Sequence, residues 1–351
     1  MKLDRRESLR KFGAFVAGSP LAQGEPLAQG EPGGGAPPSD RLAPVLELVN
    51  VPEFEDQARL VLAPARFEAI SGGHRTSFDR MTFRQRLMVY AMDLDLTTSL
   101  YGYDIFAPII VGPVGNQGDI HPEGELATAR GASAGKAVMV ATRQSSHPIE
   151  ETVAASDEPV WYQLYADSGD LSTEAARAVD AGCRAVCVTV GVSPSDHRPT
   201  GTDWGAVAGL AEAVEVPVVV KGIMSVDAAE TALAAGAQGL VVSNHGGLVD
   251  RGAGTLAIDV LPAVADAVAG RVPVLVDGSF RRGTDILKGL ALGATAVMVA
   301  RPPMWGLAAY GAEGVQTVVE ILQTELARNM AASGRPTIAM IDRELVRFDS
   351  R

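Results

Sequence analysis

The sequence predicts an α/β protein whose fold is a (β/α)8 TIM barrel with an N-terminal extension. Three observations lead to this prediction: eight short apolar segments follow one another, Ala-rich helical segments separate them, and several helical segments end in glycine. The chain has 351 residues, of which 47% are hydrophobic, so it can bury one large core. Barrels of this kind often form a single domain at such a length.

The apolar segments have the composition of strands that are buried on both faces. They are rich in Val and Ile and do not alternate strictly between polar and apolar residues, as is typical of parallel sheets. The segments span residues 106–114, 137–142, 160–165, 185–190, 217–222, 239–244, 273–278 and 296–301.

The helical segments between them end in glycine, a common helix stop, as at residues 123–135, 172–182, 225–236 and 283–293. Eight strand–helix units in succession favour a closed barrel. An open doubly wound sheet is the alternative. The G-x-G-x-x-G fingerprint of such sheets is missing from the first strand–helix turn, at residues 112–125.

Residues 1–41 differ in composition from the remainder, and the folded barrel is predicted to comprise residues 42–351. Arg5 and Arg6 precede a short apolar stretch, an order that resembles a twin-arginine export signal. The unit PLAQGE then occurs twice before a Gly/Pro-rich run, which is the composition of a linker. We expect export to the periplasm, with a cytoplasmic protein that carries a plain N-terminal tail as the alternative.

The overall composition argues against several classes of partner. The formal net charge is −12 and no long basic run occurs, which disfavours binding to nucleic acid. No apolar run approaches the roughly 18 residues of a membrane span. Cys183 and Cys187 are predicted to be core residues, because a disulfide framework or a metal site needs more ligands. We therefore expect a small-molecule substrate and no metal.

Polar residues gather at the predicted carboxyl ends of the strands, where the active site of such a barrel lies. In chain order these ends contribute Pro113, Val114, Gly115, Thr142, Gln163, Tyr165, Thr189, Lys221, Ser243, His245, Asp277, Ala300 and Arg301. A flat polar ligand can lie across such a mouth.

The loops after the last two strands have the features of a phosphate site. Gly278 and Gly283 let backbone amides turn inward, and Arg281 or Arg282 can bind phosphate oxygens with its guanidinium group. The helix that starts near Thr284 is expected to add its N-terminus.

Several segments resemble the FMN-dependent 2-hydroxy-acid oxidase and dehydrogenase family, which includes glycolate oxidase and lactate oxidase. They are HPEGE at 121–125, YQLY at 162–165, VKGI at 220–223, SNHGG at 243–247, DGSFRRGTDILKGLALGA at 277–294 and ARP at 300–302. The resemblance covers about residues 45–345. It implies FMN bound across the barrel mouth.

The resemblance also implies roles for individual residues. One set would line the flavin ring and ribityl chain: Pro113, Val114, Gly115, Thr142, Gln163, Thr189, Lys221 and Ser243. A second set would hold the ribityl and phosphate end: Asp277, Gly278, Ser279, Arg281, Ala300 and Arg301. Lys221 would stabilise negative charge on the reduced ring, although a pairing with Asp277 is the alternative. His245 would be the general base, and Tyr165 and Arg198 would bind substrate.

The family pattern is broken at three positions around the expected substrate. Leu248 stands where an arginine usually binds the substrate carboxylate, Gly191 where an aspartate holds the histidine, and Glu68 where a tyrosine contacts substrate. Possible replacements are Arg251 or Arg143 for the guanidinium and Asp196 or Glu68 for the acid. We expect oxidation of a 2-hydroxy acid. The alternatives are oxidation of an amine, alcohol or modified peptide, and a flavin-binding module with little catalysis.

The electron acceptor is left open between oxygen, a quinone and a cytochrome. No C-x-x-C-H haem motif occurs, so no fused haem domain is predicted. The resemblance implies a homo-oligomer, often a tetramer.

Replacing Arg5 and Arg6 with Lys should retain the protein in the cytoplasm if the pair is an export signal. Fractionation of cells that produce the wild type and the variant measures this. Full-length wild-type protein in the cytoplasm would show that the segment is only a tail.

Overall fold

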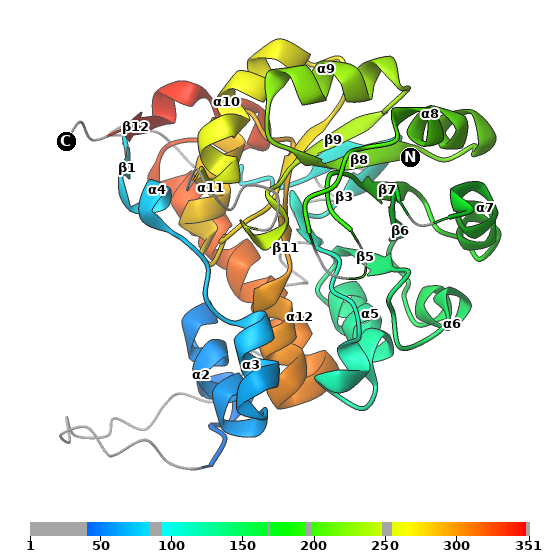
Figure 1. Cartoon of the computed structure of the whole chain (residues 1–351). Coiled ribbons are helices and arrows are strands. Elements are labelled where there is room, and N and C mark those ends of the chain that lie inside the picture. Colours follow the sequence, from blue (N-terminus) through cyan, green and yellow to red (C-terminus); the bar gives the residue numbers. More distant parts are fainter. Residues whose placement is uncertain are drawn as a thin grey trace, which may run out of the picture.

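The computed structural model describes residues 41–84, 93–167, 169–193, 195, 198–247 and 255–348. Eight parallel strands close into a barrel in the order β10-β11-β4-β5-β6-β7-β8-β9 (Figure 1), so the predicted (β/α)8 fold is confirmed. The strands are β4 (Ile109–Val111), β5 (Val138–Thr142), β6 (Val160–Tyr165), β7 (Val186–Thr189), β8 (Val218–Ile223), β9 (Gly239–Val242), β10 (Val274–Val276) and β11 (Ala296–Val299). Each lies within, or one residue beyond, one of the eight apolar segments.

A helix follows each strand and packs on the outside of the barrel (Figure 1). Three of them begin at an Asp or Ser whose side chain accepts a hydrogen bond from the backbone three residues on, a common N-cap: Asp170, Asp203 and Ser225. The helices are α5 (Gly124–Ala134), α6 (Ile149–Ala154), α7 (Leu171–Asp180), α8 (Trp204–Ala213), α9 (Val226–Ala234), α10 (Ala257–Val268), α11 (Gly283–Ala291) and α12 (Arg301–Ala332).

An N-terminal arm lies outside the barrel and packs along α12 (Figure 1). It contains η1 (Val45–Glu47), α2 (Val51–Val61), α3 (Pro64–Ile70) and α4 (Thr76–Asp79). The arm ends in β1 (Met81–Phe83), which pairs with β12 (Val346–Phe348) near the C-terminus. The remaining short elements are η2 (Gln117–Asp119), η3 (His245–Gly247), η4 (Ile338–Met340) and η5 (Arg343–Leu345).

The apolar core has two layers. An inner cluster fills the barrel, with Trp161, Cys187 and Met298 among its buried members. A larger outer cluster lies between the strands and the helices and includes Cys183. Both cysteines are free and buried, so they are core residues as predicted.

A hairpin closes the amino-terminal end of the barrel. It consists of β2 (Thr98–Leu100) and β3 (Tyr103–Ile105), and Leu100 and Ile105 belong to the inner cluster. Trp161 donates its indole N–H to Tyr103 Oη at 2.6 Å. The Tyr101 ring lies 5.7 Å from the Trp161 ring and its hydroxyl abuts Gly239, a position where a Cβ would collide with it. The functional mouth is therefore at the opposite end.

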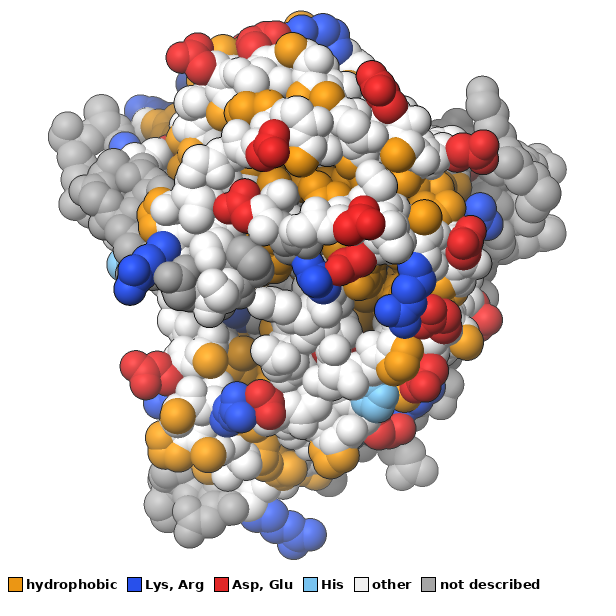
Figure 2. All heavy atoms as spheres, turned by 45° about the vertical axis from the view of Figure 1, so that its right-hand side comes forward, with side chains coloured by type: hydrophobic (Ala, Val, Ile, Leu, Met, Phe, Trp, Pro, Cys, Tyr) orange, Lys and Arg blue, Asp and Glu red, His pale blue; other side chains and the backbone are white. Residues whose placement is uncertain are grey.

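In the described part of the chain, no helix has both the length and the apolar character needed to cross a membrane. On the face shown in Figure 2, acidic side chains are scattered singly among basic ones. Among the residues coloured by type on that face, the basic side chains do not form a large cluster of the kind that binds nucleic acid.

Tyr101→Phe should leave the protein as stable or stabilise it by about 1 kcal/mol. The Tyr101 hydroxyl is buried and has no hydrogen-bonding partner among the residues that the structure describes. Folding removes this hydroxyl from water without a compensating hydrogen bond, so its deletion should not reduce the free energy of unfolding. Tyr103→Phe is the matched control: it removes the acceptor of Trp161 and should cost about 1 kcal/mol. Urea unfolding of the three proteins measures both effects, and equal losses in the two variants would contradict this account.

Candidate active site

A cavity of about 510 Å³ lies at the carboxyl ends of the strands. Eleven of the residues selected from the sequence line it: Pro113, Val114, Gly115, Thr142, Gln163, Tyr165, Lys221, His245, Asp277, Ala300 and Arg301. The sequence analysis missed eight further lining residues: Ala69, Ile70, Gly112, Asn116, Gln144, Gly246, Met298 and Met304. Most of them lie one to three residues from the end of a predicted strand, and this position could have identified them as lining residues.

Gln163 is held in one orientation by threonines on both neighbouring strands. Its Nε2 donates to Thr189 Oγ1 at 2.7 Å, and its Oε1 accepts from Thr142 Oγ1 at 2.6 Å. All three side chains are buried. Thr189 is not among the lining residues, so it positions Gln163 from behind and does not face the cavity.

Lys221 is a buried cation with two polar partners. Only 4% of the residue is exposed, and its Nζ lies 2.8 Å from Ser243 Oγ and 2.8 Å from Asp277 Oδ2. The pairing with Asp277 considered in the sequence analysis is therefore present, and Lys221 lines the cavity as well. The other carboxylate oxygen, Asp277 Oδ1, is buried and has no partner among the described residues, so it can accept a ligand hydroxyl.

The loop that carries His245 has an unusual backbone. His245, Gly246 and Gly247 have φ values of 49°, 69° and 93°, so three successive residues lie in the left-handed region. The His245 amide donates to Ser243 Oγ at 3.1 Å, which ties this loop to the hydroxyl that Lys221 contacts. The imidazole meets the Tyr165 ring edge to face, with centroids 5.9 Å apart. The two side chains face the same end of the cavity.

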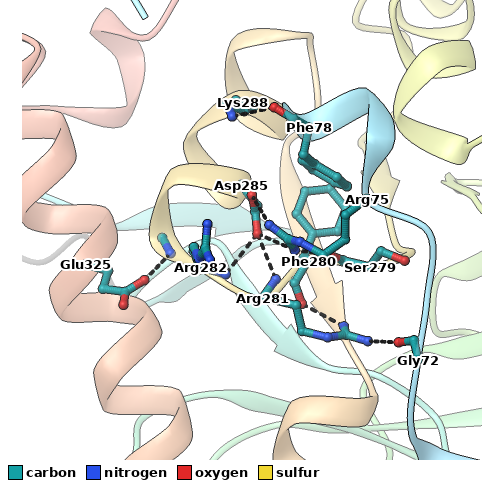
Figure 3. A network of polar contacts seen from close by, with 11 residues as sticks. Gly72, Arg75, Phe78, Ser279, Phe280, Arg281, Arg282, Asp285, Lys288 and Glu325 are labelled. Atoms are coloured by element: carbon teal, nitrogen blue, oxygen red, sulfur yellow. Dashed lines mark hydrogen bonds and ion pairs between the residues drawn. The ribbon is translucent and has the colours of Figure 1, made fainter. Parts of the chain in front are cut away.

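Two guanidinium groups converge on one backbone carbonyl. Arg281 Nη2 and Arg301 Nη1 donate to the Gly72 carbonyl at 2.8 and 3.3 Å (Arg281 with Gly72 is seen in Figure 3). Burial, and then the charge of Arg301, lower the pKa of Arg281 to about 10. Burial also lowers the pKa of Arg301. A buried and a half-buried cation side by side fit a bound phosphate, which would offset the charge of both.

Some predicted contributions to the phosphate end differ from the structure. Arg281 is buried there, whereas the side chain of Arg282 is exposed. The helix α11 begins at Gly283, and amides at and just before its start have acidic partners: Arg281 and Arg282 donate to Asp285, and Gly283 donates to Glu325 (Figure 3). Binding of phosphate by this N-terminus stays a prediction. Gly278, Ser279 and Arg281 lie in the same loop but do not line the cavity, and Ser243 does not line it either.

The predicted substrate end also differs in part. Glu68 is exposed and does not line the cavity, because the turn of α3 places its neighbours Ala69 and Ile70 there instead. Arg198 is exposed and lies outside the lining, and Arg143 pairs with Glu174 at 2.8 Å. Gly191 lies two residues after the end of β7 and has a φ of 74°. Leu248, Arg251 and Asp196 lie outside the described residues.

Comparison with known proteins agrees with this geometry. The model of the FMN-dependent dehydrogenase family matches residues 68–201 and 195–348. A peroxisomal (S)-2-hydroxyacid oxidase of Arabidopsis thaliana is 35% identical over 87% of this chain and 98% of its own length. An L-lactate oxidase of a Nostoc species is 34% identical over 84% of this chain and 96% of its own length.

A crystal structure of mandelate oxidase with (S)-2-phenylpropionate superposes with a TM-score of 0.80 at 33% identity, covering 87% of this chain and all of the other. The family model matches most of the described barrel. The two relatives are 35% and 34% identical to this chain over most of its length, which is enough to establish common family membership. The chain therefore belongs to the FMN-dependent dehydrogenase family and is an FMN-dependent oxidoreductase.

Proposed function

We propose that this enzyme oxidises a 2-hydroxy acid to the 2-oxo acid, with His245 as the general base. The observation that carries the proposal is the pairing of His245 with Tyr165 in a cavity that Arg301 also lines, with Arg281 beside Arg301 on the Gly72 carbonyl. This arrangement brings a proton-accepting side chain and anion-binding groups into one site. The names of the relatives, hydroxyacid, lactate and mandelate oxidases, support the substrate class.

Residues in and beside the cavity have the chemistry to bind FMN. Arg281 and Arg301 would hold the phosphate, and Asp277 Oδ1 would accept a ribityl hydroxyl. Gln163, fixed by its two threonines, and Lys221 would contact the polar edge of the ring. When bound, FMN supplies an acceptor for the two electrons that leave the substrate carbon.

The chain's own residues handle the proton and the orientation of substrate. His245 takes the proton of the substrate hydroxyl as the carbonyl of the product forms, and an imidazole suits this because it titrates near neutral pH. Tyr165 packs against the imidazole and limits its rotation, which holds the base toward the cavity. Lys221 offsets negative charge that arises beside it, since it lies between Ser243 and Asp277 in a dry site.

A second substrate class is favoured by one observation. Among the described residues that line the cavity, Lys221 and Arg301 are the cations, and both lie on the side assigned to the cofactor. Arg198 does not line the cavity, and Arg143 pairs with Glu174. A neutral alcohol, an amine or a modified peptide would not need a carboxylate-binding guanidinium. Anaerobic mixing with hydroxy acids, alcohols and amines, while the flavin absorbance is followed, separates the two classes.

We further propose oxygen as the electron acceptor, because the relatives reported above are named as oxidases. Oxidation of one hydroxy acid would then yield one 2-oxo acid and one hydrogen peroxide. We also propose a tetrameric assembly, on the basis of the family resemblance. Export through the twin-arginine route is proposed on the basis of Arg5 and Arg6.

His245→Ala should retain FMN and slow flavin reduction by about 100-fold or more, the usual scale for a positioned base. The cofactor should remain because the proposed phosphate residues, Arg281 and Arg301, bind the Gly72 carbonyl and come from other parts of the chain than His245. Anaerobic stopped-flow absorbance measures the rate, and the visible spectrum of the purified variant reports retention. Reduction at the wild-type rate would refute the base assignment.

Arg281→Met should weaken FMN binding by about tenfold or more, since a charge-assisted contact contributes roughly 1.5–3 kcal/mol. Arg282→Met is the matched control and should change affinity little, because that side chain is exposed. Titration of apoprotein, with flavin fluorescence as the signal, gives both constants. Riboflavin lacks the phosphate, so its affinity should be the same in both variants.

A further inference from the structure

The segment Ser71–Arg75, which we call the strap, completes the phosphate end from outside the barrel. It links α3 to α4 in the N-terminal arm. The Gly72 carbonyl accepts from Arg281 and Arg301, and the Ile70 carbonyl just before the strap accepts from Trp305 Nε1 at 2.9 Å. A Cβ on Gly73 would lie 2.7 Å from Ser279 Oγ and 2.8 Å from Arg301 Nη1. The strap therefore packs directly on the predicted phosphate residues.

Arg75 fixes the far end of the strap through a two-pronged ion pair. Its Nη1 and Nη2 donate to the two carboxylate oxygens of Asp285 at 2.9 and 3.0 Å, and Nη1 also donates to the Ser279 carbonyl at 2.7 Å (Figure 3). Ser279 has a φ of 60°, so this contact also holds a strained residue of the phosphate loop.

Asp285 is an acidic group in an unfavourable place for a phosphate site. It is 1% exposed, and its Oδ2 accepts the backbone amides of Arg281 and Arg282 at 2.9 and 3.0 Å. An anionic ligand held by the Arg281 side chain would thus meet a buried negative charge nearby, which repels it in a medium of low polarity. Glu325 adds a second acid at the same helix end, on the Gly283 amide.

Arg75 is placed to cancel that charge. Both of its terminal nitrogens face Asp285, and no more than 24% of its side chain is exposed, so solvent screens the pair weakly. With Arg75 present, the Asp285 carboxylate orders the loop amides without drawing the Arg281 guanidinium away from the cavity. Without it, Asp285 would compete with phosphate for Arg281.

We propose that Arg75 is a positioning residue for the cofactor: it neutralises Asp285 so that the phosphate end stays cationic and binds the FMN phosphate. The inference rests on the proposed binding of phosphate by Arg281 and Arg301. It places a determinant of cofactor affinity in the N-terminal arm, about 200 residues from the loop that it serves.

The test compares substitutions that separate charge from hydrogen bonding. Arg75→Lys keeps the charge and should bind FMN within about threefold of the wild type. Arg75→Gln keeps a donor for Asp285 but loses the charge, and FMN affinity should fall about tenfold or more, equivalent to about 1.4 kcal/mol. The double variant Arg75→Gln with Asp285→Asn removes both charges and should return to within about threefold of Asp285→Asn alone.

Fluorescence titration of each apoprotein with FMN and with riboflavin gives the affinities, and thermal unfolding of the apoproteins shows that each variant is folded. Riboflavin affinity should be equal across the series. If Arg75→Gln and Arg75→Lys bind FMN equally, or if the double variant is as weak as Arg75→Gln, then Arg75 is only a structural tether and the proposal fails.

The same measurements keep the two proposals apart. If Arg281→Met lowers FMN and riboflavin affinity alike, the phosphate assignment itself is wrong. If Arg281→Met selects against FMN while Arg75→Gln does not, the phosphate assignment stands and the role of Arg75 is refuted. Should Arg75→Gln not fold, the comparison of Asp285→Asn with the double variant still decides: a tenfold weaker double variant overturns charge cancellation.

Discussion

Two guanidinium groups held side by side, one buried and one half-buried, are the constraint on which the mouth of this barrel depends. Arg281 stacks on Trp305, with its Cζ 4.8 Å from the ring, and shares the Gly72 carbonyl with Arg301. Like charges in a dry site are costly unless an anion joins them. The carbonyl of Gly72 offsets part of that cost, and a phosphate would offset the rest. The surrounding elements can be understood as the means of keeping these cations in place.

The N-terminal arm is therefore part of the cofactor site. The helices α2 and α3 pack on α12, and the segment that follows them crosses the loop between β10 and α11. The barrel alone supplies the strand ends, Lys221 and His245. The arm supplies Ala69, Ile70 and the Gly72 carbonyl, so the cavity has walls from both parts of the chain.

The fold was predictable because each barrel strand is a local signal, a short and mostly apolar run that is often rich in Val. The same is true of Gln163, Lys221 and His245, whose place follows from the strand that precedes them. Glu68 was placed wrongly because its side chain direction depends on the turn of a helix, and one residue changes the face. Thr189 was assigned to the cavity although it bonds to Gln163 from behind. Arg75 was missed since its partner Asp285 lies 210 residues away and no local pattern connects them.

The separation of these contacts along the chain also bears on how the protein folds. Ser279 and Asp285 meet Arg75 across 204 and 210 residues, and β1 pairs with β12 near the other end of the chain. Contacts that close such long loops form late, because the chain loses entropy before it gains their energy. During synthesis, the phosphate end cannot assemble until almost the whole polypeptide has left the ribosome. Flavin binding therefore depends on residues as far along the chain as Arg301, and a chain that stops before Ser279 would lack the loop of the proposed phosphate end.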